Sequence, residues 1–195
     1  KLEVCQMENT FECLQQQLDK RLNQLNRPQN IHINRTLSQL LDQLDVPLNA
    51  KLACLSIDTS MKHLDRISYY HYERDAILIG DLLSAHYYQL LADLKDVELQ
   101  LQMSQAIVKI NELKSYIQHQ KDIRTDVNLK DMMITIETLL IQVLMKHYPI
   151  QQSFDDIRHQ LIQQLDVQQL SYLIDWQTDE INDIIIALQN YTKSK

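Results

Sequence analysis

At 195 residues and a net charge of −7, the chain is large enough to fold around one hydrophobic core. It has no basic stripe, so nucleic acid is not an expected partner, and no apolar run near the roughly 18 residues that a membrane span needs. One glycine and three prolines leave few residues for tight turns and exclude a glycine-rich phosphate loop.

Apolar residues recur at spacings of three and four along most of the chain, which predicts about eight helices. The predicted helices span 11–25, 37–44, 48–61, 75–94, 99–117, 129–144, 153–165 and 167–191. Residues 65–74 fit no clean period and are predicted to form a loop or an irregular helix end. The helix at 75–94 is apolar on nearly every face, so we expect it to be central. The predicted fold class is all-α, a single helical bundle over residues 1–195.

The cysteines and histidines do not show the spacing of a metal site. On one helix, Cys5 and Cys13 would be separated by ~12 Å, which is too far for a disulfide. We therefore expect Cys5, Cys13 and Cys54 to be free thiols in a reducing, cytoplasmic protein.

Gly80 lies inside the most apolar predicted helix, where a glycine costs about 1 kcal/mol relative to alanine. This position favours close packing against a crossing helix at Gly80. The neighbouring Asp81 is a lone charge among apolar residues. Its carboxylate needs a partner, solvent or an interface.

The run Ile-Leu-Ile-Gly-Asp-Leu-Leu-Ser-Ala-His-Tyr-Tyr-Gln-Leu-Leu at 77–91 resembles a segment of the trans-isoprenyl diphosphate synthases. In that family a similar Gly-Asp segment opens a central helix shortly after the first aspartate-rich motif. The continuation at 92–96 and 106–112 is similar to the component 1 subunits of bacterial heptaprenyl diphosphate synthases. The resemblance is good over residues 76–114 and weaker over 37–64, and it implies the all-α isoprenyl diphosphate synthase fold.

Catalytic members of this family bind Mg²⁺ through two Asp-Asp-x-x-Asp clusters on facing helices, and the metal neutralises the leaving diphosphate. The first cluster would begin at Asp58, where the sequence reads Asp-Thr-Ser-Met-Lys. Thr59 stands in place of the second aspartate and Lys62 in place of the last. A lysine adds positive charge to a site that holds cations, so we interpret these residues as a degenerate motif.

The second cluster has one candidate, at 154–159, where Asp155 and Asp156 are followed by His159 in place of the third aspartate. The alternative role of the two aspartates is to begin a helix, where negative charge meets the positive end of the dipole. Catalytic members also bind isopentenyl diphosphate with an early Gly-Lys-Arg segment, and no glycine precedes Gly80 here. The resemblance thus implies a chain without catalytic or metal-binding residues and without a cofactor, and Mg²⁺ is expected in a catalytic partner.

The implied function is that of a non-catalytic regulatory subunit in a heterodimeric long-chain trans-prenyl diphosphate synthase. A heptaprenyl product for menaquinone side chains is expected, with a hexaprenyl product as an alternative. The expected partner is a catalytic subunit with intact aspartate-rich motifs, contacted through much of residues 81–117. Candidate contacts are Leu83, Tyr87, Leu90, Met103, Ile107 and Ile110. A divergent but active synthase and an unrelated helical scaffold or adaptor remain open as other readings.

Overall fold

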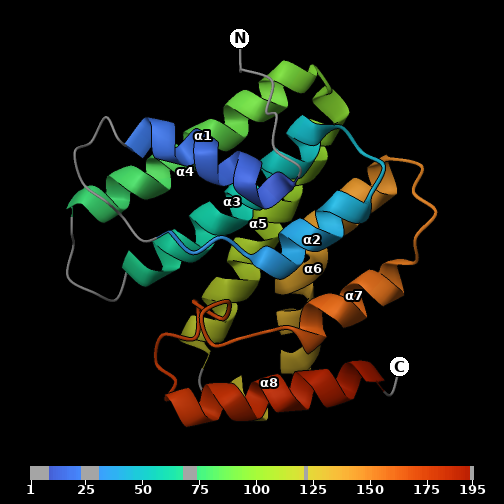
Figure 1. Cartoon of the computed structure of the whole chain (residues 1–195). Helices are drawn as coiled ribbons and strands as arrows, with labels where there is room; N and C mark the ends of the chain where they lie inside the picture. The colour runs from blue at the N-terminus through green and yellow to red at the C-terminus, as the bar shows by residue number, and fades with distance from the viewer. Residues whose placement is uncertain (1–8, 23–30, 68–73, 121–122, 194–195) are drawn as a thin grey trace.

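The computed structural model describes residues 9–22, 31–67, 74–120 and 123–193, and all regular secondary structure over these residues is helical. The helices are α1 (Thr10–Leu22), α2 (Arg35–Gln43), α3 (Leu48–Ile67), α4 (Arg74–Leu94), α5 (Val97–His119), the short 3-10 helix η2 (Ile123–Thr125), α6 (Leu129–His147), α7 (Phe154–Gln163) and α8 (Thr178–Lys193). The predicted all-α class is confirmed (Figure 1). Within the described ranges there is no helix long and apolar enough to cross a membrane.

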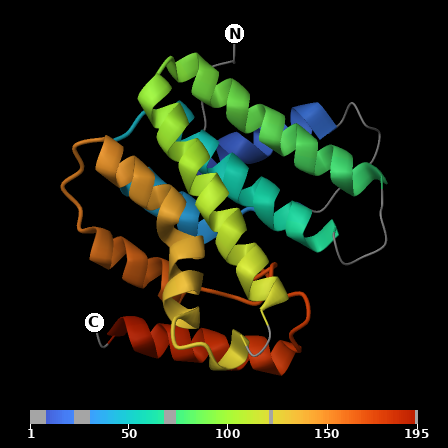
Figure 2. The ribbon, with the colours of Figure 1, turned by 180° about the vertical axis from the view of Figure 1, so that it is seen from behind.

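The central helix is α3. Every residue from 52 to 62 is buried, and α3 packs against α1, α2, α4 and α6. Helix α5 packs along α6, and α7 and α8 complete the bundle on the other side of α6. In both ribbon views α8 lies at the end of the molecule opposite α1 and α4 (Figures 1 and 2). All eight α-helices contribute buried side chains to one hydrophobic cluster.

The expectation that the helix at 75–94 is central is wrong. Helix α4 buries one face on α3, while Leu78 and Tyr88 on its other face are exposed. The polar residues Ser56, Thr59 and Ser60 gave α3 a less apolar sequence than α4, although all three are buried. Their hydroxyls form hydrogen bonds inside the bundle, and these bonds offset the free-energy cost of burying polar groups.

Small residues allow α3 and α4 to lie close together. The Ser60 hydroxyl donates to the Gly80 carbonyl at 3.0 Å, and the Ser56 hydroxyl donates to the Leu83 carbonyl at 3.0 Å. A Cβ atom added at Gly80 would lie 2.6 Å from Cγ of Leu64 on α3. Since carbon atoms make contact at about 3.5–4.0 Å, a side chain at this position would require the Leu64 side chain to move.

Two predicted boundaries differ from the structure. Helix α3 continues to Ile67, three residues into the predicted loop at 65–74; residues 68–73 of that loop lie outside the described ranges. Helix α8 begins at Thr178 and not near residue 167, because local polar contacts and buried side chains hold the preceding segment in turns. The Asp166 amide donates to the Gln169 side chain and the Gln169 amide donates to the Asp166 carboxylate.

The prediction of free thiols holds for Cys54 and is wrong for Cys13. Cys54 is a free, buried thiol. Cys13 is disulfide-bonded, so the prediction that it is a free thiol is wrong. The prediction assumed a continuous helix from Cys5 to Cys13, whereas α1 begins at Thr10. Cys5 itself lies outside the described residues.

Candidate functional site

The residues predicted to form a degenerate first aspartate-rich motif include a buried ion pair that joins two helices. The Lys62 ammonium lies 3.0 Å from Asp58 Oδ1, one turn earlier on α3, and 3.1 Å from Glu137 Oε2 on α6. The three side chains are 7%, 9% and 2% exposed, respectively. A spacing of four residues places Asp58 and Lys62 on one face of α3, and that face packs against α6.

The charges of this cluster stabilise each other. Burial alone lowers the pKa of Lys62, but the adjacent carboxylates of Asp58 and Glu137 outweigh burial and raise it above its usual value. The ammonium is therefore charged at neutral pH. Burial raises the pKa of Glu137, against the opposing effect of Lys62. One oxygen of each carboxylate, Asp58 Oδ2 and Glu137 Oε1, is buried without a hydrogen-bond partner among the described residues.

These residues do not fit the metal ion that the family's catalytic members use. A divalent cation needs several oxygen ligands around one point, and here an ammonium group lies between the two carboxylates. Thr59 is turned away from the cluster, because its hydroxyl donates to the Leu55 carbonyl of its own helix at 2.7 Å. Across the described ranges no group of three or more His, Cys, Asp or Glu side chains is arranged to hold a metal.

A second, partly buried ion pair lies further along α3. The Lys114 ammonium on α5 donates to Asp65 Oδ2 at 2.6 Å, and the Ser171 hydroxyl donates to the same oxygen at 2.9 Å. The ring of Tyr172, fully buried, lies 5.6 Å from the Lys114 nitrogen. The two ion pairs connect α3 to α5, α6 and the 164–177 segment through charges that need each other inside the core.

The candidate for the second aspartate cluster lies at the surface. Asp155 and Asp156 are in the first turn of α7, and Asp155, 76% exposed, pairs with Arg158 of the same helix at 3.2 Å. Helix α7 packs against α2, α6 and α8. An exposed aspartate on α7 and the buried Asp58 on α3 do not line one cavity, so the structure does not bring the two candidate clusters together.

The candidate partner contacts need a correction. Five of the six side chains are fully buried inside this chain: Leu83, Tyr87, Leu90, Met103 and Ile110. The sixth, Ile107, is partly buried. They belong to the faces of α4 and α5 that pack on α3 and α6. Apolar spacing identified the buried face of each helix, whereas a contact with another protein must come from the opposite face. Asp81, by contrast, is exposed on α4.

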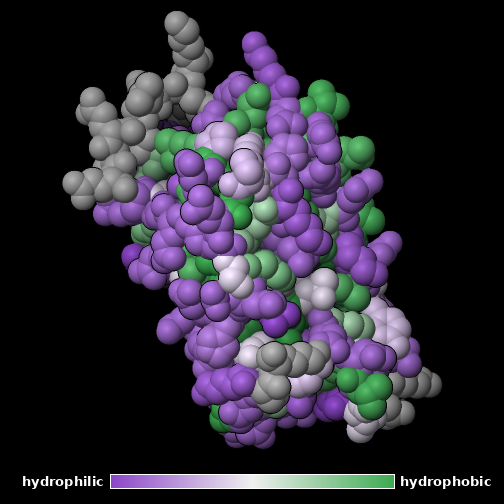
Figure 3. All heavy atoms as spheres, turned by 90° about the vertical axis from the view of Figure 1, so that its right-hand side faces the viewer, coloured by the Kyte–Doolittle hydropathy of each residue, from purple (hydrophilic) through white to green (hydrophobic). Residues whose placement is uncertain are grey.

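The outer faces of α4 and α5 carry exposed apolar side chains. On α5 these are Val97, Leu101 and Val108, which lie along one face of the helix, and on α4 they include Leu78 and Tyr88. Figure 2 shows the two helices on the same side of the molecule, joined at the corner after α4. The side view in Figure 3 shows mostly hydrophilic residues with hydrophobic ones scattered among them. Exposed apolar groups that share one face are a feature of protein interaction sites.

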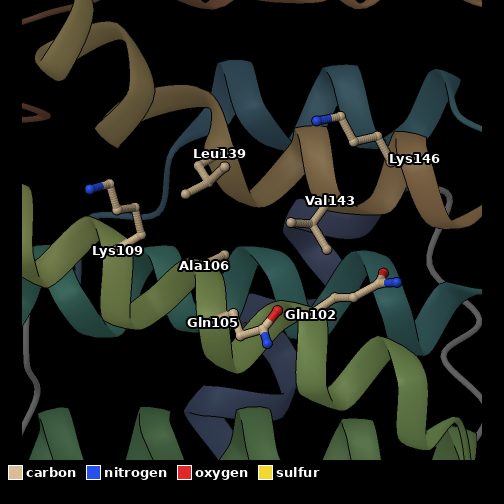
Figure 4. A pocket seen from close by; sticks show the side chains of 7 residues that line it. All are labelled: Gln102, Gln105, Ala106, Lys109, Leu139, Val143 and Lys146. Carbon is tan, nitrogen blue, oxygen red and sulfur yellow. The ribbon is translucent and has the colours of Figure 1, made fainter.

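A groove between α5 and α6 borders this outer face. It has a volume of about 350 Å³ and is lined by Gln102, Gln105, Ala106 and Lys109 of α5 and by Leu139, Val143 and Lys146 of α6. Figure 4 shows Leu139 and Val143 pointing from α6 toward Ala106. The apolar floor and polar rim make the groove a natural extension of an interaction surface.

Sequence reasoning missed Glu137 and Lys114, which complete the two ion pairs. A signal for both existed. Each is a charge at a position where helical spacing predicts burial: Glu137 follows Met133 by four residues, and Lys114 follows Ile110 by four. A charged residue on a buried helix face requires a partner, although the sequence does not say which helix supplies it.

Comparisons with known proteins agree with this arrangement. Residues 8–143 match the family model described as "HexPS-like: Hexaprenyl diphosphate synthase, small subunit". A solved structure of heptaprenyl diphosphate synthase from Staphylococcus aureus is 34% identical, with a TM-score of 0.79, and the match covers 94% of this chain and 98% of that one. No curated protein matches the sequence. The helices thus follow an isoprenyl diphosphate synthase-type fold, and the chain belongs to the small-subunit family of hexaprenyl diphosphate synthases.

Proposed function

We propose that this chain is the non-catalytic, regulatory subunit of a heterodimeric long-chain trans-prenyl diphosphate synthase. The observation that carries the proposal is the Lys62 ammonium, held between Asp58 and Glu137 at 3.0 and 3.1 Å. Where catalytic members of the superfamily bind Mg²⁺, this chain holds a positive charge of its own. A diphosphate leaving group would find no metal there to neutralise it.

The proposed mechanism is indirect. A catalytic subunit supplies both aspartate-rich clusters, Mg²⁺ and the two substrates, while this chain supports the fold of that subunit and influences the length of the product. We propose a heptaprenyl product that serves menaquinone side-chain synthesis in the cytoplasm. A hexaprenyl product is the alternative, because the family description names hexaprenyl and the solved relative is a heptaprenyl synthase.

We further propose that the outer face of α4 and α5 contacts the catalytic subunit. The exposed apolar side chains Leu101 and Val108 on α5 and Tyr88 on α4 support this assignment. They lie within residues 76–114, the part of the chain whose resemblance to the family is strongest. Burial of such side chains against a partner removes apolar surface from water, which favours association.

An activity assay tests the catalytic part of the proposal. The purified chain, incubated with farnesyl diphosphate, isopentenyl diphosphate and Mg²⁺, is expected to form no product. Addition of a catalytic subunit with intact aspartate-rich motifs is expected to yield a polyprenyl diphosphate, and chromatography of the dephosphorylated product distinguishes six from seven isoprene units. Turnover by this chain alone would contradict the proposal.

Co-purification with the catalytic subunit tests the interface. Leu101→Asp and Val108→Asp place a charge on side chains that are 58% and 57% exposed, so each variant should fold normally. Each is expected to weaken association at least tenfold, since a charge at the centre of an apolar contact is costly to desolvate. Ile186→Asp on α8 is the matched control, because Ile186 is 56% exposed and lies on another helix. Equal association of all three variants would rule out the α5 face.

A further inference from the structure

We propose that Lys62 acts as a built-in replacement for a divalent cation, and that the carboxylates around it form a latent cation site which a single substitution would open. The proposal concerns this chain alone and does not depend on a catalytic partner. It goes beyond the loss of the motif, because it assigns a present role to the residue that replaced the last aspartate.

The geometry of the cluster is that of a bound cation. Asp58 Oδ1 from α3 and Glu137 Oε2 from α6 converge on one nitrogen atom at 3.0 and 3.1 Å. An ammonium group is a compact point charge, so it holds oxygens from several directions as a metal ion does. The second oxygen of each carboxylate is buried and lacks a partner among the described residues. Those two oxygens would be available to coordinate an ion at this point.

The Lys62 ammonium also links two helices, as a bound cation between their carboxylates would. Two buried carboxylates from different helices repel each other unless a positive charge lies between them. The ammonium of Lys62 removes this repulsion and joins α3 to α6, two helices that pack against each other. Its stem comes from α3 itself, so the link requires no ion from solution. The fold is thereby independent of the Mg²⁺ concentration.

The variant Lys62→Asp tests the proposal directly. It replaces the internal cation by a third carboxylate, one helical turn from Asp58 and facing Glu137. The full-length variant is refolded and its melting temperature is measured in millimolar MgCl₂ or MnCl₂ and in NaCl of equal ionic strength. We expect the divalent cation to raise the melting temperature of Lys62→Asp by about 5–10 °C. Electron paramagnetic resonance of Mn²⁺ should count about one bound ion per chain.

The wild-type chain and Lys109→Asp are the controls. Lys109 forms an ion pair with Glu112 at 3.7 Å, with both side chains more than half exposed, so Lys109→Asp changes the charge equally without opening a buried site. Neither control should respond to divalent cations more than to NaCl. A melting temperature of the wild-type chain that rises specifically with Mg²⁺ would overturn the proposal, as would a folded Lys62→Asp that does not respond.

A second variant decides the matter if Lys62→Asp does not fold in either salt. Lys62→Ala leaves Asp58 and Glu137 facing a vacated space, and both Mn²⁺ and propylammonium should restore part of its lost thermal stability. Sodium at equal ionic strength should not. Failure of both cations would overturn the proposal. Rescue by propylammonium alone would contradict the divalent part, because it would mean that the carboxylates accept an ammonium but do not form a metal site.

Discussion

His86 is buried as a neutral imidazole, and its burial makes the folded chain less stable at low pH. It is fully buried on α4, with Nε2 2.8 Å from the Gln17 side-chain oxygen and Nδ1 without a partner among the described residues. Burial, assisted by the positive charge of Arg21, lowers the pKa of His86 to about 4. The folded chain therefore binds this proton much more weakly than the unfolded chain, whose histidines titrate near 6.5.

The sign of the pH effect follows from this difference. Between pH 6.5 and 4 the unfolded state takes up a proton that the folded state does not, so stability falls as the pH decreases through this window. The loss attributable to His86 reaches roughly 2–3 kcal/mol near pH 4. Urea unfolding at a series of pH values should show this loss in the wild-type chain and a smaller one in His86→Gln. His119→Gln, at an exposed position, should behave like the wild-type chain; identical pH slopes for all three proteins would show that His86 does not contribute.

Gly80 lies against the Leu64 side chain of α3. Helix propensity alone predicts that Gly80→Ala stabilises α4 by about 1 kcal/mol. The added Cβ would instead collide with the Leu64 side chain, and we expect a net loss of about 1–3 kcal/mol. The double variant Leu64→Ala/Gly80→Ala should lose less than the sum of the two single variants, because the smaller side chain makes room. A stabilised Gly80→Ala, measured by urea unfolding, would show that the Leu64 side chain moves aside at little cost.

The start of α5 depends on one carboxylate with two roles. Asp96 caps the helix by accepting from the Leu99 amide at 2.9 Å, and it pairs with His147 at the end of α6 at 2.7 Å. The pKa of Asp96 is lowered, first by the Leu99 amide and then, against the opposing effect of burial, by His147. A carboxylate with a lowered pKa stabilises the fold above its unfolded pKa, and this contribution is lost as the pH falls through the folded value.

Substitution of Asp96 separates the two roles. Asp96→Ala removes both and should cost about 1–2 kcal/mol at pH 7. Asp96→Asn keeps a capping oxygen and should cost less, and its stability should depend less on pH below 5 than that of the wild-type chain. Asp93→Ala, an exposed aspartate near the end of α4, is the control and should cost less than 0.5 kcal/mol by the usual size of surface substitutions. Equal losses for Asp96→Ala and Asp93→Ala in chemical unfolding would contradict the capping role.

Most helices, but only part of the candidate site, could be predicted from the sequence. Spacing of apolar residues predicted the number of helices and the ends of most of them, since helix formation depends on local periodicity. It failed at α8, where hydrogen bonds between Asp166 and Gln169 hold the preceding segment in turns. At the site, Asp58 and Lys62 were predicted to form a degenerate motif, but their contact with Glu137 was not predicted. Its role depends on how α6 crosses α3, and local spacing carries no information about that crossing.

For the whole molecule, the expected loss of catalysis does not depend on one substitution. Catalysis in the superfamily needs two clusters that hold metal ions across one cavity, so that the diphosphate is neutralised as the allylic cation forms. Under the proposed function Lys62 closes the first cluster, where it pairs with Asp58, and Asp155 and Asp156 are on the surface of α7. Restoring the first cluster alone therefore restores only half of the machinery.

The double variant Thr59→Asp/Lys62→Asp tests this conclusion. It rebuilds an Asp-Asp-x-x-Asp sequence from Asp58 to residue 62, and metal binding is expected to appear with it. Turnover of farnesyl and isopentenyl diphosphates by the purified variant should stay at the level of the wild-type chain, because the bound metal has no opposing cluster with which to hold the diphosphate. Incorporation of labelled isopentenyl diphosphate measures this turnover, with a catalytic subunit as the positive control. Product formed by the double variant alone would mean that one metal cluster is sufficient in this fold, and that Thr59 and Lys62 together keep the chain inactive.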